Sequence, residues 1–264
     1  MLLKISHTTD YIYGAPVSYA LQRLRLTPQD NSLQTVKSWQ SAVEGGSIEA
    51  RYRDQFDNLV ELVSAHRNTS AIRVIASGIV ETNDKAGVLG AHRGYMPLWL
   101  YQRETALTKP GKHIRELART LPKTGDLDQL HLLMNAIHDK MTYITGATHT
   151  ETLAEEALAD GHGVCQDHAH VFAAGARLLG FPSRYVSGYL LMDGQVEQVA
   201  SHAWAQAYIE SLGWVGFDPA NDMCPDDRYV YLAYGLDYRD AAPISGIRTG
   251  QGDEALAVSI TVEQ

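Results

Sequence analysis

The stretch Gly161-His162-Gly163-Val164-Cys165-Gln166-Asp167-His168-Ala169-His170 sets a cysteine between a glycine-rich turn and a helical pattern. Apolar residues follow at helical spacing, and two breakers then end the pattern: Ala169, Phe172, Ala176 and Leu179, then Gly180 and Pro182. A thiol in the first turn of a helix lies near unpaired backbone N–H groups and the positive end of the helix dipole, and both favour the nucleophilic thiolate. A free cysteine is most often a small buried apolar residue, so the stretch alone leaves both interpretations open.

The residues on either side of this stretch indicate an α+β domain. Upstream, helical periodicity predicts three helices, over residues 114–121, 126–141 and 153–159. The spacing of Thr152 and Glu155 predicts a capping box at the start of the third helix. Downstream, the period changes to two and predicts strands over residues 183–192, 196–209, 214–218, 229–234 and 255–262. Helices followed by meandering strands favour helices packed on an antiparallel sheet.

The first part of the chain has the pattern of a small β-sandwich. Strands are expected over residues 2–13, 19–26, 33–43, 48–63 and 72–80, with a bulge near Gln22-Arg23. We therefore divide the chain into an N-terminal β domain (1–82), a glycine-rich connector (83–109) and a core (110–264) that includes the C-terminal strand.

Composition and charge restrict the class of protein. The chain has 264 residues and a net charge of −9, which argues against binding to nucleic acid or to an anionic membrane surface. The two cysteines, Cys165 and Cys224, are too few for a disulfide scaffold. The first residues lack the apolar core of a signal peptide, so we expect a cytoplasmic protein with reduced thiols. Cys224 is expected to be a packing residue away from any site.

Two later strands supply the partners that a catalytic thiol needs. Period-two geometry places His202 on one face of its strand with Trp204 and Gln206. Asp218 ends the next strand, and a three-residue loop, 211–213, would turn it to the same face. Simple pairing through that loop sets Asp218 opposite Gln206, so local twist or a bulge must bring it to His202. In thiol catalysis the thiolate attacks, the imidazole carries the proton and the carboxylate orients the imidazole.

Four motifs together resemble the transglutaminase-like superfamily, in particular its bacterial transglutaminase-like cysteine peptidases. They are Gly163–Asp167, Arg184–Tyr189, Ser201–Trp204 and Gly213–Pro219, and His7–Tyr13 with Pro16-Val17 resembles the opening of that branch's β domain. The resemblance implies a papain-like core in which Cys165 is the nucleophile, His202 the base and acid, and Asp218 the orienting carboxylate. Two departures are the run Asp54–Asn58, where Gly-Asn is common, and His168, where an aromatic residue is common; we expect His168 to pack.

Three further residues are candidates for supporting roles. The backbone N–H of Cys165 and the side chain of Tyr143 could donate hydrogen bonds to an oxyanion, although an ordinary strand aromatic is the simpler role for Tyr143. Trp204 could shield the ion pair or anchor the core, and Gln166 lies in the first turn after the nucleophile.

The three histidines near Cys165 do not predict a metal site. His168 and His170 are two residues apart and therefore diverge on a helix, whereas metal-binding pairs prefer a spacing of four residues. His162 precedes the helix. No metal or other cofactor is expected.

The resemblance implies thioester-forming acyl transfer at an amide. Hydrolysis of a peptide or isopeptide bond is our prediction, transfer to an amine is the alternative, and a non-catalytic scaffold on the same core is a third. Family association suggests a peptide-bearing substrate and a peptide-ligase-like partner protein.

Overall fold

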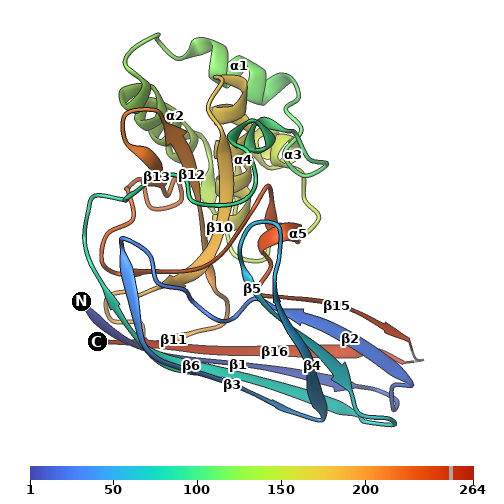
Figure 1. Ribbon diagram of the computed structural model, residues 1–264. Helices are drawn as coiled ribbons and strands as arrows, with labels where there is room; N and C mark the ends of the chain where they lie inside the picture. Colours follow the sequence, from blue (N-terminus) through green and yellow to red (C-terminus); the bar gives the residue numbers. More distant parts are fainter. Residues whose placement is uncertain (250–251) are drawn as a thin grey trace.

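The computed structural model describes residues 1–249 and 252–264 and shows a mixed α and β chain, with the helices at one end and long antiparallel strands at the other (Figure 1). The helices are η1 (Leu98–Gln102), α1 (Lys112–Thr120), α2 (Asp126–Lys140), α3 (Ala154–Asp160), α4 (Cys165–Leu178) and α5 (Tyr238–Ala241). None of the helices in the described residues is long and apolar enough to cross a bilayer.

The N-terminal β region consists of two sheets that pack on each other. It contains β1 (Leu2–Tyr13), β2 (Tyr19–Leu24), β3 (Gln34–Glu44), β4 (Gly46–Arg53), β5 (Leu59–Ala65) and β6 (Ala71–Thr82). The strand expected over residues 48–63 is in fact two strands. The Asp54 carboxylate accepts the backbone N–H groups of Phe56 and Asn58 and so stabilises a turn between β4 and β5. The bulge expected at Gln22-Arg23 is also absent, because β2 pairs with both of its neighbours in continuous register.

The end of the chain completes these two sheets rather than the core. β16 (Glu254–Glu263) pairs with β1 along its length, and β15 (Ile244–Thr249), which the pattern did not predict, pairs with β2. The sheet orders are β11-β16-β1-β6-β3 and β15-β2-β5-β4. The assignment of the C-terminal strand to the core is therefore wrong, because alternation identifies a strand without identifying its partner.

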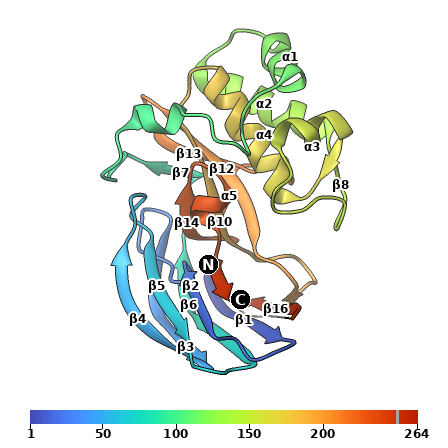
Figure 2. The same cartoon turned by 90° about the vertical axis from the view of Figure 1, so that its right-hand side faces the viewer.

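A third sheet lies beneath the helices (Figure 2). Its order is β14-β10-β12-β13-β7, with β7 (Val88–Gly90), β10 (Ser183–Leu190), β12 (His202–Ile209), β13 (Gly213–Phe217) and β14 (Tyr229–Gly235). The expected strand over 196–209 is interrupted, since β11 (Glu197–Gln198) pairs with β16 instead. On one face of β12, Ala203, Ala205 and Ala207 are buried, and these small side chains allow α4 to pack closely against the strand.

Two buried amides join the β region to the edge strand of this sheet, β14. Gln34 donates to the Tyr231 carbonyl at 2.9 Å and accepts the Tyr231 N–H at 2.7 Å. Asn58 makes the same pair of bonds with Tyr234, at 2.7 and 2.8 Å. Both side chains are fully buried, so each satisfies a peptide group of β14 that water does not reach. These bonds fix the β region against the core.

Candidate active site

Cys165 is the first residue of α4 and is 9% exposed. The turn before it is held by Asp167, whose Oδ2 accepts the Val164 N–H at 2.8 Å and the Thr148 hydroxyl at 2.6 Å. A Cβ on Gly163 would lie 2.7 Å from the Asp167 Cβ, so this position requires glycine. The glycine and the acidic cap that surround the thiol in the sequence therefore build the turn that presents it.

The Tyr143 segment is brought to the same place by a short parallel ladder. β8 (Thr142–Tyr143) pairs with β9 (His162–Gly163), directly before the α4 turn. The Tyr143 phenol lies beside the Cys165 thiol and backbone, and its side chain is 51% exposed. Burial and then the neighbouring Cys165 raise the pKa of Tyr143 to about 12. Its hydroxyl thus keeps its proton at neutral pH and can donate a hydrogen bond.

His202 and Asp218 meet through a bond of 2.6 Å between Nε2 and Oδ2. The pairing Ala205↔Phe217, extended by one residue, sets Asp218 opposite Trp204, which is one same-face position from His202. The expected position opposite Gln206 is wrong because the turn is 210–212 and Gly213 already belongs to β13. Gly213 has a φ of +80°, and a Cβ there would lie 2.1 Å from the Gly90 carbonyl oxygen. Because this register places Asp218 two residues nearer to His202 than expected, no bulge is needed to join them.

Asp218 is fully buried and accepts hydrogen bonds from four further donors. Its Oδ2 accepts from the Asn221 side chain and the Tyr229 hydroxyl, each at 2.8 Å. Its Oδ1 accepts the backbone N–H groups of Ala220 at 3.0 Å and Asn221 at 3.2 Å. Sequence reasoning did not identify Asn221 or Tyr229. Asn221 directly follows the Asx turn that Asp218 forms with Ala220, which is a detectable signal, whereas Tyr229 lies in a different strand and gives none.

This environment favours an ionised pair. Burial alone would lower the pKa of His202, but the Asp218 carboxylate and the neighbouring Cys165 raise it to about 10. Burial would raise the pKa of Asp218, but the imidazole and the bonds from Asn221 and Tyr229 hold it below its usual range. Because Nε2 is bound to Asp218, Nδ1 is the ring nitrogen available to the thiol.

Trp204 and Gln166 have different relations to these groups. The Trp204 ring stacks on His202 with centroids 6.0 Å apart and is fully buried, so it covers the imidazole and anchors the core at once. Gln166 donates instead to the Thr150 carbonyl at 3.2 Å, and the structure does not bring its side chain to the thiol.

The three histidines of the nucleophile segment each bond to backbone. His168 is buried, with its ring nitrogens 2.9 Å from the Val164 carbonyl oxygen and 3.2 Å from that of Met141, so it packs α4 against the end of α2. His170 Nε2 accepts the Tyr238 N–H, and His162 contacts the Asp160 carbonyl. Within residues 1–249 and 252–264, no three His, Cys, Asp or Glu side chains gather as metal ligands would. Cys224 lies half-buried beside Gly87, where burial raises its pKa to about 11.

Two family models match the chain. The transglutaminase-like superfamily model covers residues 115–219, which include Cys165, His202 and Asp218. The bacterial transglutaminase-like N-terminal region covers residues 3–81.

Similar proteins align with this chain over nearly their whole length. An uncharacterized protein of Mycobacterium leprae is 28% identical over 274 residues, with 98% of each chain covered. An uncharacterized protein of Mycobacterium tuberculosis is 27% identical, with 98% of this chain and 91% of that one covered. Among solved structures, a candidate cysteine protease from Cytophaga hutchinsonii aligns with a TM-score of 0.80 at 21% identity, covering 100% of this chain and 90% of that one. At that identity, the structural likeness establishes the fold.

Proposed function

Because the chain joins a bacterial transglutaminase-like N-terminal region to a transglutaminase-like core, we propose that it is a cysteine peptidase or amidase acting through Cys165, His202 and Asp218. The observation that carries this proposal is the buried His202–Asp218 pair beside a thiol on the first residue of a helix. Structural proteins have little use for such a pair, because burying two charges costs free energy that only good geometry offsets.

The proposed acylation steps follow from the arrangement of Cys165, His202 and Asp218. His202 already holds the proton of the Cys165 thiol as an imidazolium, and the thiolate attacks the carbonyl carbon of an amide to form a tetrahedral oxyanion. The Cys165 N–H and the Tyr143 hydroxyl are the proposed donors to that oxyanion. The imidazolium then protonates the departing amine and leaves a thioester on Cys165. Asp218 holds the ring in position throughout and stabilises its positive charge.

Water completes the proposed reaction. His202, now neutral, takes a proton from a water molecule that attacks the thioester, which releases a carboxylic acid and restores the thiol. The half-exposed Tyr143 at the edge of the thiol is consistent with access of water to this position. An amine in place of water would give transglutamination, and a chain that never forms the thioester would be a scaffold. We propose a peptide or isopeptide substrate, a peptide-ligase-like partner and a reducing cytoplasmic setting.

The test separates these three functions with one acyl donor. Wild type, Cys165→Ala and Cys224→Ala are each incubated with 4-nitrophenyl acetate, with and without hydroxylamine as the amine acceptor. Nitrophenolate release measures acylation, intact mass locates the acetyl group, and the ratio of acetate to acetohydroxamate identifies the preferred acceptor. We expect acylation of wild type and Cys224→Ala alone, with acetate as the main product. Hydroxamate in large excess would favour the amine transferase, and acylation that survives Cys165→Ala would exclude the catalytic proposal.

A further inference from the structure

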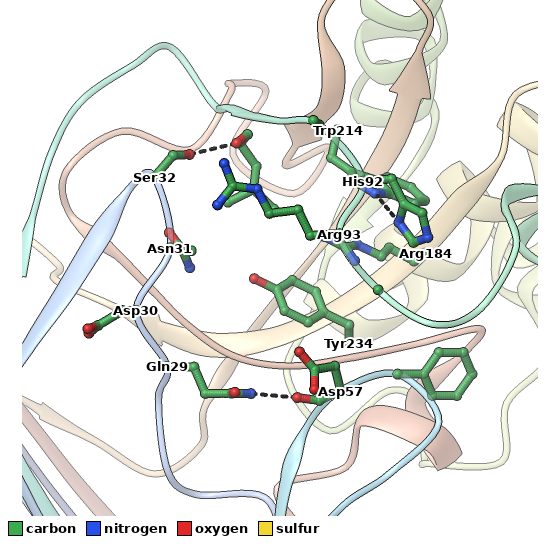
Figure 3. A pocket seen from close by; sticks show the side chains of 14 residues that line it. Gln29, Asp30, Asn31, Ser32, Asp57, His92, Arg93, Arg184, Trp214 and Tyr234 are labelled. Carbon is green, nitrogen blue, oxygen red and sulfur yellow. Dashed lines mark hydrogen bonds between the residues drawn. The ribbon is translucent and has the colours of Figure 1, made fainter.

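A cavity of about 530 Å³ lies where the β region, the connector and the third sheet meet (Figure 3). Its walls are residues 29–32 and 56–57 of the β region, residues 89 and 91–94 of the connector, and three side chains of the sheet, Arg184, Trp214 and Tyr234. Drug-sized ligands occupy cavities of this size. Neither Cys165 nor any partner that the mechanism uses lines it.

Arg184 is the unusual member of this wall because it is a buried cation among neutral groups. Its side chain is only 6% exposed, and its guanidinium carbon lies 4.2 Å from the centre of the Trp214 ring and 3.9 Å from that of Tyr234. Its Nε donates to the Gln206 amide oxygen at 2.8 Å, and the Tyr101 hydroxyl also lies beside it. Across the described residues, no carboxylate approaches it within ion-pair distance, whereas Arg25 and Arg51 each have one.

The buried positive charge of Arg184 is poorly compensated in the free protein. Buried charges in proteins are normally paired, and the two aromatic faces offset only part of the lost hydration. With Nε bound to Gln206, the terminal N–H groups remain as planar donors that match an oxyanion. Burial also lowers the pKa of the Arg184 guanidinium, which is the direction expected for a cation that lacks a negative partner.

A second arginine and two aspartates define what kind of anion fits. Arg93 is exposed, forms no ion pair with a described residue, and extends across the cavity in Figure 3. Asp57 also lines the cavity but is paired with Arg53 at 2.9 Å, and Asp30 accepts the Val36 N–H. These two carboxylates oppose a multiply charged ligand, so a single negative charge is favoured.

We propose that this cavity binds a small molecule or peptide end that carries one carboxylate, held by Arg184 and Arg93 with its apolar part against Trp214 and Phe56. The site is separate from the proposed reaction. The pairs Arg184↔Gln206 and Gly188↔His202 set the two sites four residues apart along one sheet face, about 13 Å. Trp204, fully buried, fills the face between them.

Hippurate, an aromatic monocarboxylate, and its neutral amide hippuramide form a matched pair of probes for calorimetric titration. We expect hippurate to bind wild type at least about tenfold more tightly than hippuramide, because the amide carries no negative charge and offers one acceptor oxygen where the carboxylate offers two. Inorganic phosphate tests the other source of an oxyanion and is expected to bind more weakly than hippurate. Equal binding of acid and amide, or no binding at about 10 mM, would overturn the proposal. Tighter binding of phosphate would overturn its carboxylate part.

Three variants locate the binding. Arg93→Gln is expected to weaken hippurate several-fold, and Arg67→Gln, an exposed arginine in a distant loop, is expected to leave its affinity unchanged. Arg184→Lys keeps the charge without the planar fork and should weaken hippurate about tenfold. If thermal unfolding shows that Arg184→Lys does not fold, the Arg93→Gln and Arg67→Gln pair still decides. Equal losses in those two variants would place any binding outside this cavity.

Discussion

His202 and Arg184 occupy the same face of the third sheet, and both place a cationic group in buried surroundings. His202 has a carboxylate at 2.6 Å that is itself fixed by four other donors. Arg184 has two aromatic rings, an amide and a phenol, all neutral. The charge of His202 has its negative partner within the chain, whereas the charge of Arg184 gains one only from a ligand. In the proposed function the first charge takes part in the reaction, and in the proposed binding site the second charge attracts a ligand.

Breaking the His202–Asp218 pair is expected to have the largest effect on activity. Asp218→Asn removes the negative charge and presents an amide to Nε2, so the ring loses both its orientation and the stabilisation of its imidazolium. We expect the rate of acylation by 4-nitrophenyl acetate to fall by about 10³–10⁴-fold. Thermal unfolding serves as the control for folding. Activity within about tenfold of wild type would mean that the carboxylate does not support the reaction.

Removing one donor beside the thiol should have a smaller effect. Tyr143→Phe deletes the proposed second oxyanion donor while its half-exposed ring stays in place, and we expect acylation to slow by about 10–10²-fold with unchanged stability. The rate of alkylation of Cys165 by iodoacetamide involves no oxyanion and is the internal control. If Tyr143 instead restricts the thiol, both rates would rise in Tyr143→Phe.

The charge on His202 also predicts how stability depends on pH. Its folded pKa, about 10, lies above the ordinary value of 6.5, so the pair stabilises the native state fully below about 6.5. That contribution is lost as pH rises through 10. We expect the free energy of unfolding of wild type to fall between pH 6.5 and 10 relative to His202→Phe, measured by urea denaturation at each pH. Parallel curves for the two proteins would show that His202 is not a cation in the native state.

Two tyrosines that both pack on Trp204 provide a matched comparison of donors. The Tyr229 hydroxyl donates to Asp218, whereas the equally buried Tyr231 hydroxyl has no partner among the described residues. We expect Tyr229→Phe to lower the free energy of unfolding by about 1.5–3 kcal/mol and Tyr231→Phe to leave it unchanged or raise it. Urea denaturation measures both. Equal losses would indicate that packing on Trp204, and not the bond to the carboxylate, explains the role of Tyr229.

The sequence predicts the His202–Asp218 pair far better than it predicts the surroundings of Arg184, for a physical reason. Cys165, His202 and Asp218 are recognisable because local features mark them: a glycine turn before a helix, alternation along β12, and Asp-Pro at the end of β13. Their exact register depends on Gly213 passing beneath the Gly90 carbonyl, a contact between segments more than a hundred residues apart. The same limit explains why β16 was assigned to the wrong sheet. Arg184 lies in a recognised motif, but its environment comes from Trp214, Tyr234 and Tyr101, which only the fold assembles.

The substitution Gln206→Glu gives Arg184 the kind of partner that His202 already has, a carboxylate. Gln206 is fully buried, its Oε1 accepts from Arg184 and its Nε2 has no partner among the described residues. Gln206→Glu therefore places a carboxylate on the guanidinium and removes an unsatisfied donor, with a net change in stability of about 1 kcal/mol or less, since desolvation opposes the attraction. Calorimetric titration should then show weaker binding of hippurate, because the positive charge that attracts it is neutralised within the chain. Unchanged affinity would mean that the Arg184 charge was never available to a ligand, and that its two rings already complete its surroundings.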